Sequence, residues 1–179
     1  MGTQSDYLVS LAKSTGQLDF EAVYRTELPR VYNFFRYRLG DDQTAEDLTA
    51  ETFEKAWRHR ARYRDDLAAF STWLFTIARR VATDHFRKWR PSLPLDEAEP
   101  VSDSQTPQDA SQERTEFAHL SALLTRLAER ERELVALKYG AGLTNRAIAR
   151  ISGLSESNVS TILSRVTHQL RTQLENEHE

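Results

Sequence analysis

Cysteine is absent from this chain of 179 residues, and glycine and proline are scarce, with six and five residues. The lack of cysteine excludes disulfides, thiolate nucleophiles, iron–sulfur clusters and cysteine zinc sites. So few glycines and prolines leave little room for a fold of sheets and turns. No apolar run approaches the length of a membrane span, and the N-terminus lacks the basic and apolar regions of a secretory signal. We therefore expect a cytoplasmic protein without membrane insertion.

The net charge of −3 conceals a segregation of charge along the chain. Residues 41–56 contain six acids and one lysine, whereas residues 57–90 contain nine Lys or Arg and three acids. Residues 91–113 contain six acids and no Lys or Arg, and a second basic block follows within 140–174. Local charge, rather than the average, decides which charged partner each segment can meet.

A linker is predicted at residues 91–112. This stretch holds four of the five prolines, together with Ser, Asp and Gln, and almost no bulky apolar residue. Such a composition is typical of a flexible connection, and its length argues for two domains. The sequence predicts an all-α protein with a helical domain at 1–90 and a second one at 113–179.

Helical periodicity runs through the first of these domains. One helix is predicted from six apolar residues spaced three or four apart: Phe20, Tyr24, Leu28, Val31, Phe35 and Leu39. A second helix, 44–57, is predicted to begin at a Thr44 cap and to bury Leu48, Thr52, Phe53, Ala56 and Trp57. A third begins near Phe70, with its apolar residues Trp73, Leu74, Ile77 and Val81 facing inward.

The end of the chain has the pattern of a helix-turn-helix. Thr144 can cap a short helix, residues 152–154 form a tight turn around Gly153, and Ser155 can cap a longer helix that runs to about Leu174. The apolar residues of the long helix would pack inward. Its polar residues remain outside and are suited to reading base edges in a major groove: Glu156, Ser157, Asn158, Ser160, Thr161, Ser164 and Arg165.

A basic face is predicted on the helix 70–90, where Thr76, Arg80, Thr83, Arg87 and Arg90 are spaced three or four apart and Arg79 and Lys88 flank them. For an isolated helix, a solvated surface is the simpler interpretation. The preceding stretch, RHRARYR, adds further arginines, and cations at this density favour contact with phosphates.

Aromatic residues beside this face admit two interpretations. Trp57, Phe70 and Trp73 could stack on unpaired bases, but their helical phasing favours a place in the core. Trp89 lies off the apolar stripe, and the sequence does not favour either interpretation for it. The polar stretch 64–69, which begins with Arg64 and Asp65, is the better candidate for holding an extruded base.

The acidic cluster around residues 41–54 could in principle bind Mg²⁺ or Ca²⁺. Most of its acids lie along a predicted helix rather than in a metal-binding loop, so helix capping, solvation and contact with a basic partner explain them better. The five histidines do not have metal-site spacing, and no phosphate-binding or nucleophile motif occurs. The sequence therefore predicts no catalytic residue, no metal and no cofactor, and the protein is not expected to be an enzyme.

Three stretches carry a resemblance to a known family. AEDLTAETFEKAW and FSTWLFTIARRVATDHFRK resemble region 2 of bacterial sigma factors, and residues 124–174 resemble their region 4. With nothing substantial between the two regions, the chain resembles the extracytoplasmic-function (ECF, group 4) class of the sigma-70 family. The resemblance implies a protein that binds core RNA polymerase, through its β′ clamp and β subunits, and promoter DNA, with an anti-sigma factor as a further partner.

The resemblance also implies residue roles. Region 2 would read and melt the −10 element through Arg64, Asp65, Thr76, Arg79, Arg80, Thr83, Arg87 and Lys88. Region 4 would read the −35 element through Arg146, Ser157, Asn158, Ser160, Thr161, Ser164 and Arg165. The acidic helix would dock on the basic coiled coil of the β′ clamp through Glu46, Asp47, Glu51 and Glu54.

The chain departs from the family pattern at three positions that bear on these roles. Ala50 stands in place of the usual Gln, Arg80 in place of a frequent Asn, and Ala147 in place of a Glu that would complete a capping box with Thr144. The promoter sequence of a relative is therefore not carried over to this chain.

Two other functions remain as alternatives. The chain could be a conventional helix-turn-helix regulator whose first domain senses a signal or dimerises, or a protein-interaction module without a DNA function. A conventional regulator would not need a basic helix beside an acidic one in its other domain, and no apolar stripe is left over for self-association. In vitro transcription with core polymerase separates these alternatives from a sigma factor.

Overall fold

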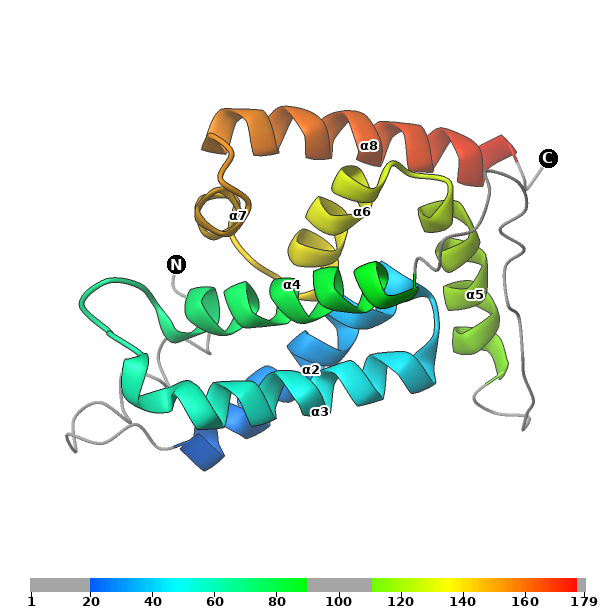
Figure 1. The fold of residues 1–179 in the computed structure, drawn as a ribbon. Helices are drawn as coiled ribbons and strands as arrows, with labels where there is room; N and C mark the ends of the chain where they lie inside the picture. Colours follow the sequence, from blue (N-terminus) through cyan, green and yellow to red (C-terminus); the bar gives the residue numbers. More distant parts are fainter. Residues whose placement is uncertain (1–19, 90–110, 177–179) are drawn as a thin grey trace.

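The computed structural model describes residues 20–89 and 111–176. Every regular element in these two ranges is a helix, as the all-α prediction requires (Figure 1). The elements are α2 (Phe20–Leu39), α3 (Asp42–His59), the short helix η1 (Arg60–Arg62), α4 (Phe70–Trp89), α5 (Ser111–Thr125), α6 (Glu129–Val135), the π-helical turn η2 (Ala136–Gly140), α7 (Asn145–Ser152) and α8 (Glu156–Asn176). Tyr7, Leu8 and Leu11, whose spacing in the sequence makes a short apolar stripe, lie outside the described residues.

Helix α2 lies at the centre of the fold and packs against α3, α4, α5, α6 and η2. Its predicted apolar row is only partly buried, because Val31 and Phe35 are fully covered whereas Tyr24 is 40% exposed. The buried positions are Val23, Glu27, Val31, Phe34, Phe35 and Arg38. Pro29 lies inside α2 and does not end it.

Helix α3 begins one turn earlier than the sequence predicted. Its N-cap is Asp41, whose carboxylate accepts a hydrogen bond of 2.7 Å from the backbone N–H of Thr44, so the expected Thr44 cap is wrong. A carboxylate at this position satisfies an orphan N–H and also interacts favourably with the helix dipole. The prediction for the buried face is confirmed at four positions: Leu48, Thr52, Phe53 and Ala56.

Trp57 is the exception on α3. It was expected in the core, but it is 49% exposed, with the Arg60 guanidinium 4.0 Å from the centre of its ring and Phe20 in edge contact. In contrast, Phe70 of α4 is buried and Trp73 packs against the core, as predicted. The prediction that Leu74 and Val81 face inward is also confirmed.

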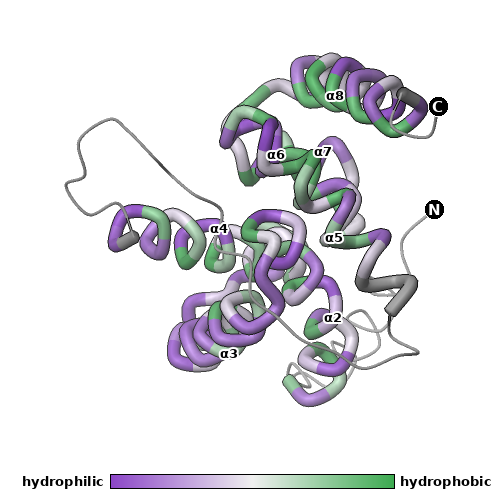
Figure 2. The backbone as a smooth tube through the Cα atoms, turned by 90° about the vertical axis from the view of Figure 1, so that its right-hand side faces the viewer, coloured by the Kyte–Doolittle hydropathy of each residue, from purple (hydrophilic) through white to green (hydrophobic). Residues whose placement is uncertain are grey.

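The helix-turn-helix forms as predicted. The Thr144 hydroxyl accepts a hydrogen bond from the N–H of Ala147, the Ser155 hydroxyl accepts one from the N–H of Asn158, and Gly153 adopts a left-handed conformation with φ of 73°. This conformation strains residues with a Cβ, which explains the glycine. Hydrophobic residues recur along α8 between hydrophilic ones (Figure 2), and the buried ones are Val159, Leu163, Val166 and Leu170.

The N-terminal unit (20–89) and the C-terminal unit (111–176) contribute to one apolar core. The buried cluster runs from Phe34 and Phe75 in the first unit to Leu134, Leu137 and Ala141 in the second. Most of the proposed linker lies outside the described residues, although its last two residues, 111 and 112, belong to α5. The two units therefore pack face to face.

Candidate nucleic-acid and polymerase interfaces

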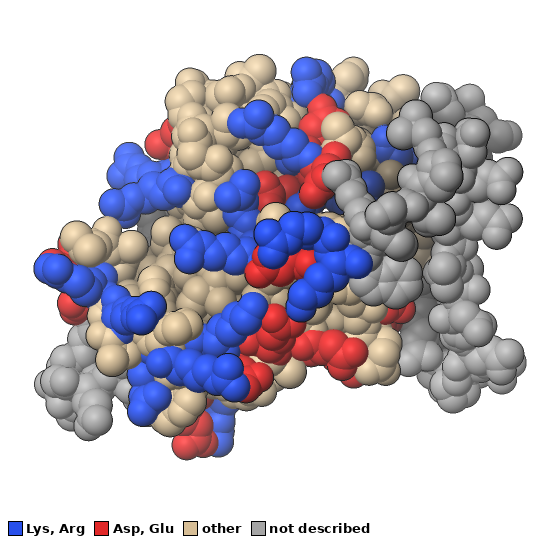
Figure 3. Space-filling model, viewed as in Figure 1, with Lys and Arg blue, Asp and Glu red and all other residues tan. Residues whose placement is uncertain are grey.

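Helix α4 carries the predicted basic face. Figure 3 shows Lys and Arg side chains gathered where α4 crosses the front of the molecule, with acids between them. Arg80, Arg87 and Lys88 are exposed, and Arg87 forms an exposed ion pair of 3.2 Å with Asp84. Arg80 forms no ion pair with any other residue in the described ranges. These cations can therefore meet a polyanion from the solvent.

The two threonines of this face are partly occupied by their own helix. Thr76 is half-buried and donates to the carbonyl of Thr72 at 2.8 Å, and the exposed Thr83 donates to the carbonyl of Arg79 at 2.9 Å. Arg90, which the sequence placed on the same face, lies outside the described residues.

The segment 64–69 joins η1 to α4 and is mostly exposed. Arg64 and Asp66 form a bidentate ion pair, in which the guanidinium donates to the two carboxylate oxygens at 3.1 and 2.7 Å. These hydrogen bonds lower the pKa of the Asp66 carboxyl. The Tyr63 hydroxyl donates to the carbonyl of Ala68 at 3.3 Å, while the Tyr63 ring packs on Phe70. The segment is thus anchored to the start of α4, beside the basic face.

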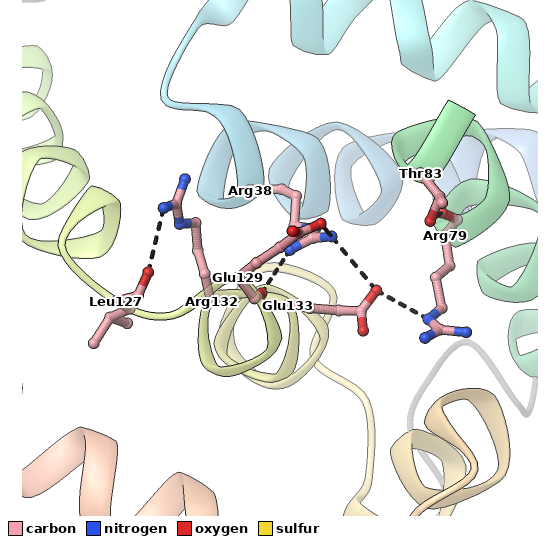
Figure 4. A network of polar contacts seen from close by, with 7 residues as sticks. All are labelled: Arg38, Arg79, Thr83, Leu127, Glu129, Arg132 and Glu133. Carbon is pink, nitrogen blue, oxygen red and sulfur yellow. Dashed lines mark hydrogen bonds and ion pairs between the residues drawn. The ribbon is translucent and has the colours of Figure 1, made fainter. Parts of the chain in front are cut away.

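Arg79 is bound differently from the rest of the face. Its Nε donates to Glu133 of α6 at 2.9 Å, and Arg38 of α2 lies 3.7 Å from the same carboxylate oxygen (Figure 4). Glu133 is buried, and Arg38 is only 2% exposed. Burial lowers the pKa of Arg38, against the opposing influence of Glu133 and Glu129. The sequence did not predict this network, which joins the two units.

The predicted reading face of α8 is exposed. All seven polar residues assigned to it face the solvent: Glu156, Ser157, Asn158, Ser160, Thr161, Ser164 and Arg165. The Thr161 hydroxyl donates to the carbonyl of Ser157 at 3.0 Å within the helix. Arg165, whose side chain is 67% exposed, forms an ion pair of 2.6 Å with Glu131 of α6.

Arg146 of α7 lies near this face, with its Nε 3.6 Å from the carboxylate of Glu156. Its side chain is 83% exposed. Both arginines assigned to the −35 element therefore have an acidic neighbour, which a DNA phosphate or base would have to replace.

A cleft of about 430 Å³ flanks the reading face, and two of the cations that line it were not predicted from the sequence. Ser160 and Ser164 line it from α8, together with Lys138 of η2 and Arg171 of α8. Arg171 follows Ser164 by seven residues, so helical periodicity alone could have placed it on this face. Lys138 comes from a separate element, and no local pattern connects it to α8.

The acids of α3 lie on its outer face. Glu46, Asp47 and Glu54 are exposed, and Glu51 is half-exposed. Glu51 pairs with Lys55 at 2.7 Å, whereas Glu46 and Asp47 have no ion pair with a described residue. Asp47 is therefore available to a basic partner.

An apolar groove of about 390 Å³ borders these acids between α2 and α3. Tyr24, Leu28, Tyr32 and Ala50 line it, together with the acid Glu46. Only the charged residues here were predicted from the sequence; the apolar part of the surface was not, because it combines residues from two helices.

Neither a metal centre nor a membrane span is found in residues 20–89 and 111–176. These ranges contain no group of three or more His, Asp or Glu side chains able to hold a metal ion. No helix within them is both long and apolar enough to cross a membrane.

Comparison with known proteins assigns both units to one family. Residues 23–90 match the family described as Sigma-70 region 2, and residues 123–172 match Sigma-70, region 4. The chain belongs to the sigma-70 family. Each match falls within one unit of this sigma-70 family member. The acidic helix α3 and the basic helix α4 therefore lie in region 2, and the helix-turn-helix lies in region 4.

Curated relatives place the chain in the ECF class. It is 33% identical over 159 residues to the ECF RNA polymerase sigma factor BldN of Streptomyces coelicolor, a match that covers 87% of this chain and 60% of the relative. It is 26% identical over 155 residues to the ECF RNA polymerase sigma factor SigM of Bacillus subtilis, with 86% and 94% of the two chains covered. The resemblance read from the sequence is confirmed.

Solved structures share the fold. CnrH, in a complex with the cytosolic domain of CnrY, has a TM-score of 0.70 and 22% identity, over 96% of this chain and 97% of that chain. The sigma factor RpoE of Bartonella quintana, in a complex with the anti-sigma factor NepR, has a TM-score of 0.66 and 21% identity, over 88% and 97%. Both likenesses extend over the N-terminal and C-terminal units.

Proposed function

We propose that this protein is an alternative sigma factor of the ECF class, which binds core RNA polymerase and directs it to promoters with defined −10 and −35 elements. The observation that carries the proposal is the presence of both sigma-70 regions in one chain, each with an exposed charged or polar face. As a regulatory subunit, the protein would not be an enzyme, and it would act where the polymerase acts, in the cytoplasm.

Each of three surfaces would carry out one part of this function. The exposed cations of α4 and the segment 64–69 would hold the −10 element, since Lys and Arg neutralise phosphates. The outer face of α8 would enter the major groove of the −35 element, as the second helix of a helix-turn-helix does. The acids of α3, with the apolar groove beside them, would bind the polymerase.

Anti-sigma factors are proposed as further partners. The sigma factor RpoE of Bartonella quintana, which shares this fold, was solved in a complex with the anti-sigma factor NepR. Because this chain shares its fold, the same class of partner is expected to bind here.

In vitro transcription tests the whole proposal. Core RNA polymerase should produce promoter-specific transcripts only when this protein is added, and the promoters can be found by mapping transcription start sites after overexpression. A helix-turn-helix regulator that acts without being a polymerase subunit would bind its site in the absence of core polymerase and would not confer promoter specificity on it.

Charge reversal on α3 should weaken polymerase binding. We expect the double variant Asp47→Lys, Glu51→Lys to reduce affinity for core polymerase by about tenfold or more. Two lysines would then face the basic surface of the polymerase, and repulsion would replace the attraction of the two acids. Helical content, measured by circular dichroism, should stay the same, since both residues lie on the outer face. The matched control is Glu116→Lys, an exposed acid on α5. If the control and the double variant bind core polymerase equally well, α3 is not the docking helix.

Removal of two cations from α4 should impair promoter opening. The double variant Arg80→Ala, Arg87→Ala is expected to lower the salt-dependence slope of promoter binding by about two, since each phosphate contact contributes about one. Permanganate footprints of the melted region should weaken in parallel. Arg25→Ala, which removes an exposed arginine from α2, is the control. Footprints that are the same in the variant and the parent would show that this face does not touch the −10 element.

A further inference from the structure

Glu131 of α6 faces the arginine that is expected to read a base from α8. Helix α6 packs against α8 (Figure 1), and the Arg165 guanidinium donates to the Glu131 carboxylate at 2.6 Å across this contact. The two residues lie 34 positions apart in the chain. In the part of the chain that the structure describes, each is the only ion-pair partner of the other. Arg165 therefore has a partner within the protein before it meets any DNA.

The two side chains of this pair differ in exposure. Glu131 is only 22% exposed, whereas Arg165 is mostly exposed. Glu131 also lies in the first turn of α6, where the helix dipole favours an acid. The carboxylate is thus held by its surroundings, while the long arginine is open to solvent. When Arg165 moves away, a carboxylate that is largely removed from water loses its cation, and this loss has a cost in free energy.

The other arginine assigned to the −35 element has no comparable partner. The Arg146 Nε lies 3.6 Å from the carboxylate of Glu156, and both side chains are more than half exposed. An exposed pair at this distance contributes little to the free energy. Breaking it on DNA therefore costs little, so Arg165 is the arginine whose acid affects the binding energy.

The cost of breaking the Arg165 pair depends on the base that Arg165 meets. Guanine offers O6 and N7 to the two arms of a guanidinium, and this bidentate contact can replace the ion pair. The other bases do not accept the same two hydrogen bonds, so Arg165 then keeps its pair with Glu131. The free energy of the pair is thus subtracted from the binding of a guanine site and not from the binding of the other sites.

We infer that Glu131 is a specificity-determining residue of the −35 interface, which acts through Arg165 and weakens the preference for guanine at the base pair that Arg165 reads. It gives Arg165 an alternative partner, so a promoter without that guanine is bound with a smaller loss of affinity. The inference rests on the proposed function and on the base-reading role of Arg165. It means that the chain accepts a broader set of −35 sequences than Arg165 alone would allow.

Replacement of Glu131 by Gln tests this role in the holoenzyme. Four promoters are compared that differ only at the base pair read by Arg165, which is the one whose preference Arg165→Ala relaxes. The measured quantity is the ratio of the affinity for guanine to the affinity for each other base. Glu131→Gln should raise this ratio by about threefold to tenfold, between the effect of an exposed ion pair and that of a buried one. A ratio that stays the same or falls would overturn the inference.

Three further variants separate the ion pair from charge and from folding. Glu156→Gln removes an acid from the same surface and should leave the ratio at this base pair unchanged. The double variant Glu131→Gln, Arg165→Ala should have the ratio of Arg165→Ala alone, because Glu131 acts through the arginine. If Glu131→Gln raises the ratio equally without Arg165, this mechanism is refuted. Should circular dichroism show that Glu131→Gln does not fold, Glu131→Asp, which shortens the side chain, takes its place under the same criterion.

Failure of the proposed function gives a different result. A parent protein that confers no promoter specificity on core polymerase would refute the sigma-factor assignment. A parent that distinguishes the four promoters through Arg165, with the same ratio in Glu131→Gln, would refute only the role of Glu131. An even loss of affinity with Arg165→Ala would leave no base preference for Glu131 to act on, and it would overturn the inference while the proposed function stands.

Discussion

Replacing Arg30 by Met is expected to lower the free energy of unfolding by about 3–5 kcal/mol. The Arg30 guanidinium donates to both carboxylate oxygens of Glu27, at 2.9 and 2.8 Å, and Glu27 is completely buried in α2. The variant would take the Arg30 guanidinium away from this buried acid and would also remove the hydrogen bond to Ala141. Thermal unfolding should shift down by about 6–20 °C for a chain of this length.

Two further variants show whether the buried charge is the cause. The double variant Glu27→Met, Arg30→Met should recover most of the lost stability, because it removes the buried carboxylate together with the cation that stabilises it. Arg25→Met breaks an i,i+4 pair with Glu21 on the same helix, but both side chains are at least 75% exposed. It should change stability by less than about 0.5 kcal/mol. A single variant Arg30→Met as stable as Arg25→Met would contradict the argument.

Replacing Arg165 by Ala is expected to cost about 1–3 kcal/mol on the preferred −35 sequence and to relax preference at one base pair. Arg165 is the only Lys or Arg between Glu156 and Leu170, so it alone on this part of α8 can donate two hydrogen bonds to guanine O6 and N7. In the free protein it pairs with Glu131 at 2.6 Å, and this pair must break when the arginine reaches DNA.

Most arginine contacts to DNA go to phosphates, which gives a second interpretation with a different outcome. Holoenzymes containing the parent or the variant should be assayed on every single-base variant of the −35 element. Arg171→Ala is the matched control, since Arg171 lies in the cleft beside the reading face and is expected to lower affinity evenly on all sequences. A uniform loss with Arg165→Ala, like that of the control, would refute base reading.

Local sequence signals predicted much of this fold because they act within one or two helical turns. The caps at Thr144 and Ser155 and the left-handed Gly153 depend on residues no more than four positions away, and all three form as expected. The exposed face of α8 follows from the spacing of its apolar residues. The Asp41 cap of α3 was also within reach of a local argument, but the Thr44 alternative was preferred and is wrong.

The interfaces were predictable only in part. The α4 cations, the α3 acids and the α8 polar row each lie on one helix, so periodicity brings their members to one face. Lys138 and the groove around Tyr24 and Ala50 combine separate elements and were missed. Trp57 was expected in the core. Its side chain is instead half-exposed, because the helices that pack on α3 cover the neighbouring Ala56 but leave Trp57 partly open to solvent.

The sequence by itself determined the helices, the caps of the helix-turn-helix, the order of the two regions and the sign of charge on each face, because those properties depend on near neighbours in the chain. Only the tertiary structure decided which charges are buried. Glu27, Arg38 and Glu133 look like ordinary surface residues in the sequence, yet each is 5% exposed or less. The physical reason is that a buried charge needs its counter-charge, and the Glu129 carboxylate that pairs with Arg38 lies 91 residues away. No local pattern reports such a distant partner, so the contact between the two units could be found only in the folded chain.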